Sequence, residues 1–305
     1  MMKRILDCQA SDFALMNSSD LKNSIRAAEG RTILSECIVS WTPLLRDVSN
    51  PEVARSFGAD LLLLNFFDVN EPQINGLPES KGQDVVHVLK KFTGRPVGIN
   101  LEPVDALAVM VDEKITIPVG RTLNLNTVER AIELGFDFIC VTGNPKTGVT
   151  NQEIINGIQM IRKHVGERIL VIAGKMHAAG TEATWKEVEL IHLAETFAGA
   201  GADVVLLPAP ATVPGIDYLL LRPAVQRAHE LGALVMLTVG TSQEGADMET
   251  IRQIALQSKM SGADIFHLGD AGTLGIAEPN NILAASDALR GRRHTLRRMA
   301  ASPLR

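Results

Sequence analysis

The sequence is punctuated by one short pattern that decides the fold: Gly58-Ala59-Asp60, repeated as Gly135-Phe136-Asp137, Gly201-Ala202-Asp203 and Gly262-Ala263-Asp264. Each copy directly precedes a short apolar segment. Glycine readily takes the left-handed conformation that ends a helix, and the two following residues can close a tight turn into a strand. Between the copies, other apolar segments follow a second kind of entry: Gly30-Arg31, Gly94-Arg95-Pro96, Gly166-Glu167-Arg168 and Gly232-Ala233. The chain therefore consists of units arranged in pairs.

Eight apolar segments follow these entries, and their length and β-branched residues are typical of buried strands. They are Ile33–Val39, Leu61–Phe67, Val97–Leu101, Phe138–Thr142, Ile169–Ala173, Val204–Leu207, Leu234–Val239 and Ile265–Leu268. Between them lie segments whose apolar residues recur every three or four positions: Asp84–Phe92, Thr127–Leu134, Asn151–Val165, Trp185–Ala198, Leu219–Leu231 and Met248–Met260. This alternation predicts a parallel sheet. Eight units in four pairs favour a closed (βα)8 TIM barrel over an open doubly wound sheet or two domains.

The 305 residues suit a single barrel domain with short additions at both ends. Residues 1–30 form an N-terminal helical extension, in which Asp12–Ala28 is the expected extra helix, with Ser18 and Ser19 as caps. We expect this helix to plug the amino-terminal mouth of the barrel, which spans residues 31–290. Residues 291–305 are interpreted as a basic, solvated tail. The arginines of this cluster are Arg290, Arg292, Arg293, Arg297 and Arg298.

Composition narrows the class of protein. A net charge of -5 argues against broad binding to nucleic acid or to anionic lipid, because both need clustered positive charge. Cys8, Cys37 and Cys140 are odd in number and widely spaced, which indicates reduced thiols rather than disulfides. No signal-peptide core and no run of about 20 apolar residues is present. We expect a cytoplasmic protein that forms a homo-oligomer.

Three residues near the carboxyl ends of predicted strands are the expected catalytic groups, because barrel enzymes place their chemistry there. Glu36 lies inside an apolar strand, where a carboxylate is costly unless paired, so it is either functional or part of a structural ion pair. Lys175 can attack a carbonyl as a Schiff-base nucleophile, bind an anion or serve the structure. His267, before a glycine-rich loop, is either an acid–base group or a buried structural histidine.

Further polar residues at these strand ends are expected to bind the substrate. They are Asn65, Asn100, Glu102, Asn144, His177, Thr238, Thr241, Ser242, Gly269, Asp270, Gly272 and Thr273. The last six belong to the loops after the seventh and eighth strands, which in many barrels hold phosphate with backbone N–H groups. Glu244 and Asp270 count against a bare phosphate pocket, and an ordinary glycine-rich turn is the alternative.

A divalent metal is a possible cofactor, although no cofactor is certain from the sequence. Glu36, Glu102, His267 and Asp270 supply the oxygen and imidazole ligands that such ions accept, and residues from different strands converge in a barrel mouth. No His-x-His or HExxH spacing accompanies them.

Two short segments carry a resemblance to known proteins. Leu63-Leu64-Asn65-Phe66-Phe67-Asp68-Val69 and Arg95-Pro96-Val97-Gly98-Ile99-Asn100, together with the late glycine-rich loops, resemble the BtpA-like phosphate-binding barrels. That resemblance implies either catalysis or a role in assembly or regulation. Overall the chain also looks like a bacterial family of uncharacterised barrels often labelled haloacid dehalogenase-like hydrolases. The Asp-x-Asp pair of such hydrolases is missing, since Asp68 is followed by Val69 and Asn70.

The leading hypothesis is an enzyme of lyase or isomerase type that acts on a small phosphorylated or carboxylated metabolite. Lys175 binds or activates a carbonyl, Glu36 or His267 transfers protons, and the late loops hold an anionic end. One alternative is a metal-assisted hydrolase. Another is a barrel that binds a metabolite for regulation or assembly without turning it over.

Overall fold

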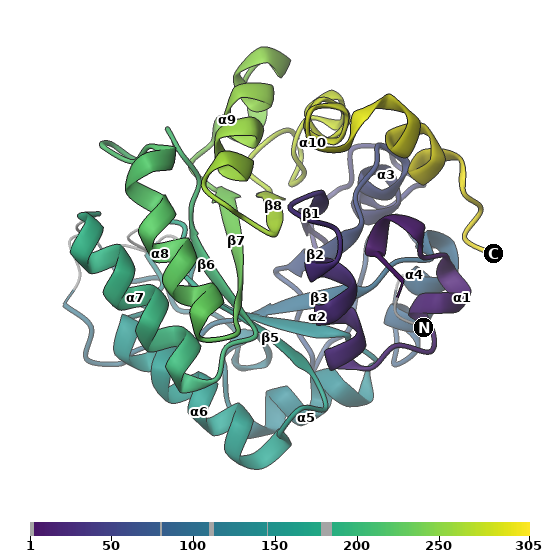
Figure 1. Cartoon of the computed structure of the whole chain (residues 1–305). Coiled ribbons are helices and arrows are strands. Elements are labelled where there is room, and N and C mark those ends of the chain that lie inside the picture. Colours follow the sequence, from purple (N-terminus) through teal and green to yellow (C-terminus); the bar gives the residue numbers. More distant parts are fainter. Residues whose placement is uncertain (1–2, 80, 110–112, 145, 178–184) are drawn as a thin grey trace.

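The computed structural model describes residues 3–79, 81–109, 113–144, 146–177 and 185–305. Its strands run parallel and close into a barrel in the order of the sequence, from β1 to β8 (Figure 1). The strands are β1 Thr32–Ile38, β2 Leu61–Asn65, β3 Val97–Leu101, β4 Phe138–Val141, β5 Leu170–Gly174, β6 Val204–Pro208, β7 Leu234–Val239 and β8 Ile265–Leu268. The predicted (βα)8 barrel is confirmed.

Helices surround the barrel on its outside (Figure 1). They are α3 Asn50–Ser56, α4 Val85–Thr93, α5 Leu125–Glu133, α6 Asn151–Val165, α7 Glu187–Ala200, α8 Tyr218–Glu230, α9 Met248–Met260 and α10 Pro279–Ala300. The bounds of α6 and α9 are those predicted. Two short 3-10 helices, η2 Val119–Arg121 and η3 Gln243–Gly245, lie in the loops before α5 and α9. No helix in the described ranges is long and apolar enough to cross a membrane.

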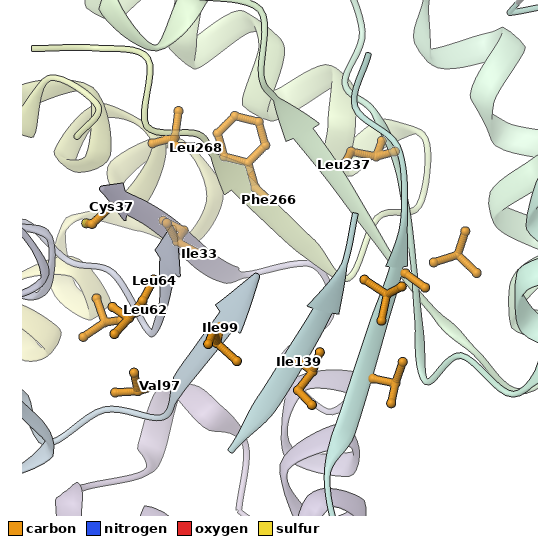
Figure 2. Close-up of a cluster of buried hydrophobic side chains, with 14 of the residues drawn as sticks. Ile33, Cys37, Leu62, Leu64, Val97, Ile99, Ile139, Leu237, Phe266 and Leu268 are labelled. Carbon is orange, nitrogen blue, oxygen red and sulfur yellow. The ribbon is translucent and has the colours of Figure 1, made fainter. Parts of the chain in front are cut away.

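Alternate residues of each strand feed two separate cores. Outward side chains such as Leu62, Ile99 and Phe266 pack between the barrel and its helices (Figure 2). Inward side chains, including Phe138, form a second core inside the barrel. Phe138 fits because its neighbour on β3 is Gly98, where an added Cβ would lie 2.1 Å from the ring.

The N-terminal extension closes one mouth of the barrel. It contains η1 Ile5–Asp7, α1 Ala10–Phe13 and α2 Ser18–Arg26, so the single helix expected over Asp12–Ala28 is divided in two. The cap of α2 is Asn17, whose side chain accepts from the backbone N–H of Asp20, rather than Ser18 or Ser19. Ile5, Leu21 and Ile25 belong to the inner core, which explains why the extension covers the amino-terminal mouth as expected.

The aspartate of each Gly-x-Asp repeat makes the same two hydrogen bonds. Its backbone N–H donates to the carbonyl of a residue in the preceding strand, and its Oδ2 accepts from the N–H of that same residue. We call this arrangement the aspartate clamp. The four clamps are Asp60 on Ile33, Asp137 on Val97, Asp203 on Val171 and Asp264 on Val235, with Oδ2 to N distances of 2.9, 2.8, 3.0 and 2.9 Å. Each clamp joins an odd strand to the next even strand at the amino-terminal edge.

The Asp60 clamp is completed by two buried arginines from α10. Arg290 Nη1 lies 2.5 Å from Asp60 Oδ2, and Arg298 Nε lies 2.7 Å from Oδ1. The interpretation of residues 291–305 as a solvated basic tail is therefore wrong, because α10 continues to Ala300 past a kink at Gly291. Arg292, Arg293 and Arg297 are exposed, as the charge pattern indicated. The charge pattern could not show that Arg290 and Arg298 contact Asp60, which lies more than 200 positions earlier in the sequence.

We predict that Asp60→Asn lowers the free energy of unfolding by about 3–5 kcal/mol, because it leaves two buried guanidinium groups without a counter-charge. Urea unfolding followed by circular dichroism measures this loss. Asp264→Asn is the matched control, since Asp264 makes the same clamp but pairs with a half-exposed His229; its expected loss is about 1–2 kcal/mol. Equal losses in the two variants would contradict the role given to the buried arginines.

Candidate active site

A layer of polar side chains lies inside the barrel at the carboxyl ends of the strands. Strand alternation turns Glu36, Asn65, Asn100, Thr238 and His267 inward, and all five are buried. The inward residues nearer the amino-terminal mouth are apolar and belong to the inner core. Because buried polar groups are costly unless they are satisfied, this layer is the part of the interior where chemistry is expected.

Glu36 occupies the middle of this layer and is only 3% exposed. Asn100 Nδ2 donates to its Oε1. His267 Nε2 lies 3.2 Å from its Oε2, in a direction outside hydrogen-bond geometry. Burial raises the pKa of Glu36 to about 7, and the nearby Glu102 also raises it, while the hydrogen bond from Asn100 acts in the opposite direction. Glu36 can thus accept or release a proton near neutral pH.

His267 is oriented by Thr238 on the neighbouring strand. Thr238 Oγ1 lies 3.0 Å from Nδ1 of His267, and the two residues are partners in the register of β7 and β8. Burial lowers the pKa of His267 to about 4, so the imidazole is neutral at pH 7. A neutral imidazole can donate one hydrogen bond and accept another, which suits a group that orients a substrate beside Glu36.

A second polar network lies nearer the mouth. Asn65 Nδ2 donates to Asp270 Oδ2 at 2.8 Å and to Asn144 Oδ1 at 2.9 Å. Glu102 accepts from Asn144 twice, from Nδ2 at 2.8 Å and from the backbone N–H at 2.9 Å. Arg121 Nη2 also donates to Glu102, at 3.0 Å. The structure therefore brings together four of the predicted substrate-binding residues, along with Arg121, which was not predicted.

The site is rich in acidic groups. Burial raises the pKa of Asp270 to about 7, and the charge of Glu36 raises it further. Glu244, in η3, also has a pKa of about 7 because of burial, with contributions from Asp270 and Glu36. Its carboxylate occupies space beside Gly269, where an added Cβ would lie 2.3 Å from Oε1. Sequence reasoning treated Glu244 only as a charge that disfavours phosphate and missed its burial.

Two of the three hydroxyls expected to help bind phosphate in the late loops are used within the protein. Thr241 Oγ1 donates to the Thr212 carbonyl at 2.7 Å, and Thr273 Oγ1 donates to Glu278, so both hydroxyls are used within the protein. Ser242 is exposed. Gly272 packs against the backbone, with the Ile276 carbonyl 2.3 Å from an added Cβ. These contacts and the acidic Glu244 and Asp270 disfavour anion binding by the side chains of the late loops, while phosphate binding by their backbone N–H groups stays a prediction.

Lys175 and His177 follow β5 directly. The Lys175 side chain is buried, and burial lowers its pKa to about 8. Burial lowers the pKa of His177 to about 4, and the charge of Lys175 lowers it further, so the two lie near each other. Between them Met176 reaches toward β7, where its Sδ would lie 2.3 Å from a Cβ on Gly240. At pH 7 about a tenth of Lys175 is therefore neutral, far more than for an ordinary lysine, and the neutral form is the one that an amine nucleophile requires.

The four expected metal ligands are divided between two networks. Glu36 and His267 are adjacent, whereas Glu102 is paired with Arg121 and Asp270 is bonded to Asn65. Within the described part of the chain, no group of three or more His, Cys, Asp or Glu side chains is arranged to hold a metal ion.

Arg121 and the aromatic residues beside it were not identified from the sequence. The guanidinium carbon of Arg121 lies 4.1 Å from the centre of the Phe66 ring, and Trp41 packs edge-on against the same ring at 5.9 Å. Arg121 belongs to the long loop between β3 and α5, where no periodicity indicates direction. The sequence feature that could have indicated Arg121 is a single arginine after Gly120, in a loop expected at the carboxyl ends of the strands.

These features define a (βα)8 barrel with a buried, acid-rich polar layer at the carboxyl ends of its strands. The chain belongs to the family described as "Domain of unknown function (DUF7916)", whose profile matches residues 6–305. No curated protein matches the sequence significantly. Nothing in the family or the fold supports a haloacid dehalogenase label, because that class has a doubly wound sheet, whereas a BtpA-like phosphate-binding barrel is compatible with the closed barrel.

Several solved enzyme structures share the fold at low sequence identity. An archaeal fructose 1,6-bisphosphate aldolase is 14% identical, with 86% of this chain and 95% of that chain covered and a TM-score of 0.53. A Schiff base-forming fructose-1,6-bisphosphate aldolase is 15% identical, with 91% and 95% covered and a TM-score of 0.51. The carboxyl transferase domain of Rhizobium etli pyruvate carboxylase is 13% identical, with 96% and 51% covered and a TM-score of 0.51. At these identities the likeness establishes the fold.

The raised pKa of Glu36 predicts how stability depends on pH. Between pH 4.5 and about 7 the folded protein holds a proton on Glu36 that the unfolded chain releases, so this group stabilises the fold at low pH and loses that effect as the pH rises. Relative to wild type, Glu36→Gln should therefore gain about 3 kcal/mol in free energy of unfolding across this window. Urea unfolding at several pH values measures the difference between the two proteins.

The test uses the difference in free energy of unfolding between Glu36→Gln and wild type, because His267 changes the stability of both proteins with pH in the opposite direction to Glu36. Its pKa of about 4 means that the unfolded chain binds a proton first, so its contribution grows as the pH rises toward 6.5. Glu133→Gln, at an exposed position of α5, should show a constant difference from wild type. A constant difference for Glu36→Gln as well would contradict the raised pKa.

Proposed function

We propose that the protein is an enzyme of lyase or isomerase type that acts on a small phosphorylated or carboxylated metabolite. The observation that carries this proposal is the position of Glu36: a buried carboxyl with a pKa of about 7, hydrogen-bonded by Asn100 and 3.2 Å from a neutral His267. A general acid–base group works best when its pKa lies near the working pH. The proposed substrate carries a carbonyl, because a carbonyl makes the C–H bond on the adjacent carbon acidic enough for a general base to remove the proton.

In the proposed reaction, the neutral amine of Lys175 adds to the carbonyl to give a carbinolamine, which takes up a proton and loses water to form an iminium. For an isomerase, Glu36 removes a proton from the neighbouring carbon and returns it to another atom of the resulting enamine. For a lyase, Glu36 takes the proton of a hydroxyl, the adjacent carbon–carbon bond breaks, and its electron pair enters the iminium. Protonation of the enamine and hydrolysis release the product and restore the amine.

Two features support this assignment of roles. The desolvation that lowers the pKa of Lys175 to about 8 favours the nucleophilic form of the amine. The fold is shared with an aldolase described as forming a Schiff base, which makes lysine chemistry in this barrel a reasonable starting hypothesis. Asn65 and Asn100 are assigned to orienting the substrate. A cytoplasmic homo-oligomer stays a prediction.

The role of Glu36 predicts proton exchange with solvent. Incubation in D2O with a panel of sugar phosphates and 2-oxo acids should incorporate deuterium next to the carbonyl of the true substrate, as followed by NMR. Glu36→Gln should lower the exchange rate by about 10²- to 10⁴-fold while the far-ultraviolet circular dichroism spectrum is retained. Glu133→Gln should exchange at the wild-type rate. Tight binding of a metabolite without exchange in wild type would instead favour a regulatory or assembly barrel.

The role of Lys175 predicts a covalent adduct. Sodium borohydride added during incubation with the same panel should reduce the iminium and increase the mass of one peptide, the one that contains Lys175. Lys175→Met should give no adduct and no turnover, since the thioether cannot add to a carbonyl. A fully active Lys175→Met variant would disprove the lysine-centred mechanism, although proton transfer by Glu36 would remain.

A further inference from the structure

We propose that Arg121 is the receptor for the anionic group of the metabolite, a carboxylate or a phosphate, at the rim of the polar layer. The proposal rests on the proposed function for the existence of such a metabolite and assigns its anionic end to a residue outside the late loops. The argument uses the support of Arg121 by its loop, the hydrogen-bond donors of its guanidinium and the charges that surround it.

The backbone around Arg121 is fixed by several hydrogen bonds. The N–H of Arg121 donates to Pro118 at 3.0 Å, and its carbonyl accepts from Glu102 at 3.0 Å. The preceding Gly120 accepts from Val69 at 3.2 Å and fits closely against Asp68, whose Oδ1 would lie 1.7 Å from an added Cβ. Two strand ends therefore hold the residue in place before any ligand binds, which reduces the entropy lost on binding.

The guanidinium group is oriented but not saturated. Its face rests on the Phe66 ring at 4.1 Å, and Nη2 donates to Glu102 at 3.0 Å. A guanidinium has five N–H donors, and among the described residues only Glu102 accepts from this one. The side chain keeps 13% of its surface exposed. A carboxylate or phosphate can therefore receive two parallel hydrogen bonds from its remaining donors.

Glu102 orients Arg121 without using up its donors. Oε1 of Glu102 accepts from both Arg121 and the Asn144 amide, and Oε2 accepts from the backbone N–H of Asn144, so Glu102 is held in place from two directions. Aromatic stacking and one ion pair fix the plane of the guanidinium, as is common where arginine recognises a planar anion. A lysine at this position would present a point charge without the fork.

The distribution of charge favours this rim over the late loops. Glu244 and Asp270, beside the late loops, are acidic groups that repel an anion once ionised. Arg121 lies at the other end of a continuous chain of hydrogen bonds that runs from Asp270 through Asn65 and Asn144 to Glu102. Arg121, with its partner Glu102, supplies the guanidinium donors at one end of this chain, and Asp270 lies at the other, so the proposed anion binds at the Arg121 end.

The position of Arg121 also suits the reacting end of the metabolite. In the register of β1 and β2, Asn65 is paired with Ile38, one inward-facing layer nearer the mouth than Glu36. Asn65, a member of the network that ends at Arg121, is therefore the next inward-facing residue after Leu63, the register partner of Glu36. A metabolite held at the rim by its anionic group extends inward, and its carbonyl carbon enters the layer that contains Glu36 and His267.

The test measures binding of two simple probes, inorganic phosphate and malonate, by isothermal titration calorimetry. Arg121→Gln should weaken binding of the probe that wild type prefers by at least tenfold. The affinity of Arg121→Lys should fall between those of wild type and Arg121→Gln, because lysine keeps the positive charge but loses the paired N–H donors of the guanidinium. Arg130→Gln is the matched control, because this partly exposed arginine of α5 pairs with Glu133 away from the polar layer, and it should bind as wild type does. Circular dichroism verifies that each variant is folded.

Wild-type affinity in Arg121→Gln overturns the proposal, and so does a wild-type protein that binds neither probe. Glu36→Gln separates this result from the proposed function: it should bind the probes normally while losing deuterium exchange. For a substrate that exchanges, Arg121→Gln should raise KM by at least tenfold and leave kcat within a fewfold of wild type. An unchanged KM in Arg121→Gln would mean that the anionic group binds elsewhere, while the proposed proton transfer by Glu36 would still stand.

Discussion

The fold depends on the aspartate clamp. In each clamp, an aspartate at the start of an even strand hydrogen-bonds both the backbone C=O and the backbone N–H of one residue in the preceding strand. Parallel strands are joined by long crossovers, so their relative register is not fixed by a short turn. Four clamps at one edge set that register in each strand pair, from Asp60 on Ile33 to Asp264 on Val235. With the amino-terminal edge fixed in this way and covered by the N-terminal helices, the opposite edge is free to carry polar residues.

The polar layer at that opposite edge gains its properties from burial rather than from unusual residues. Glu36, Asp270 and Glu244 reach pKa values of about 7 because they share a space with little water and repel one another when ionised. His267 and Lys175 are shifted toward their neutral forms by the same desolvation. The three carboxyl groups therefore change protonation near neutrality, while the guanidinium of Arg121 stays positively charged beside the network. Under the function that we propose, the carboxyl groups transfer protons and Arg121 anchors the metabolite.

The sequence was sufficient for the barrel and for much of the site, because both follow from periodicity. Strand ends are recognised from local patterns, and alternation then turned Glu36, Asn65, Asn100 and His267 to the inside. It was insufficient for Arg121 and Glu244, which lie in loops where direction depends on tertiary contacts. The same limit explains the arginines of α10: local charge density suggests solvent, whereas Arg290 and Arg298 reach a buried aspartate. Thr241 and Thr273 were assigned to a ligand because the sequence does not reveal that nearby carbonyl and carboxylate groups use them first.

The pairing of Asp60 with α10 has a consequence for the order in which the molecule is assembled. Arg290 and Asp60 are separated by 230 positions, and Arg298 contacts the Ile5 carbonyl across 293 positions. During synthesis the first strand pair therefore emerges long before the cations that neutralise its aspartate. In the folded protein Asp60 meets these arginines where the last helix, α10, packs on α3 and β1. Completion of the barrel is thereby coupled to release of nearly the whole chain, and the slow step of folding is expected to be this closure rather than formation of any single unit.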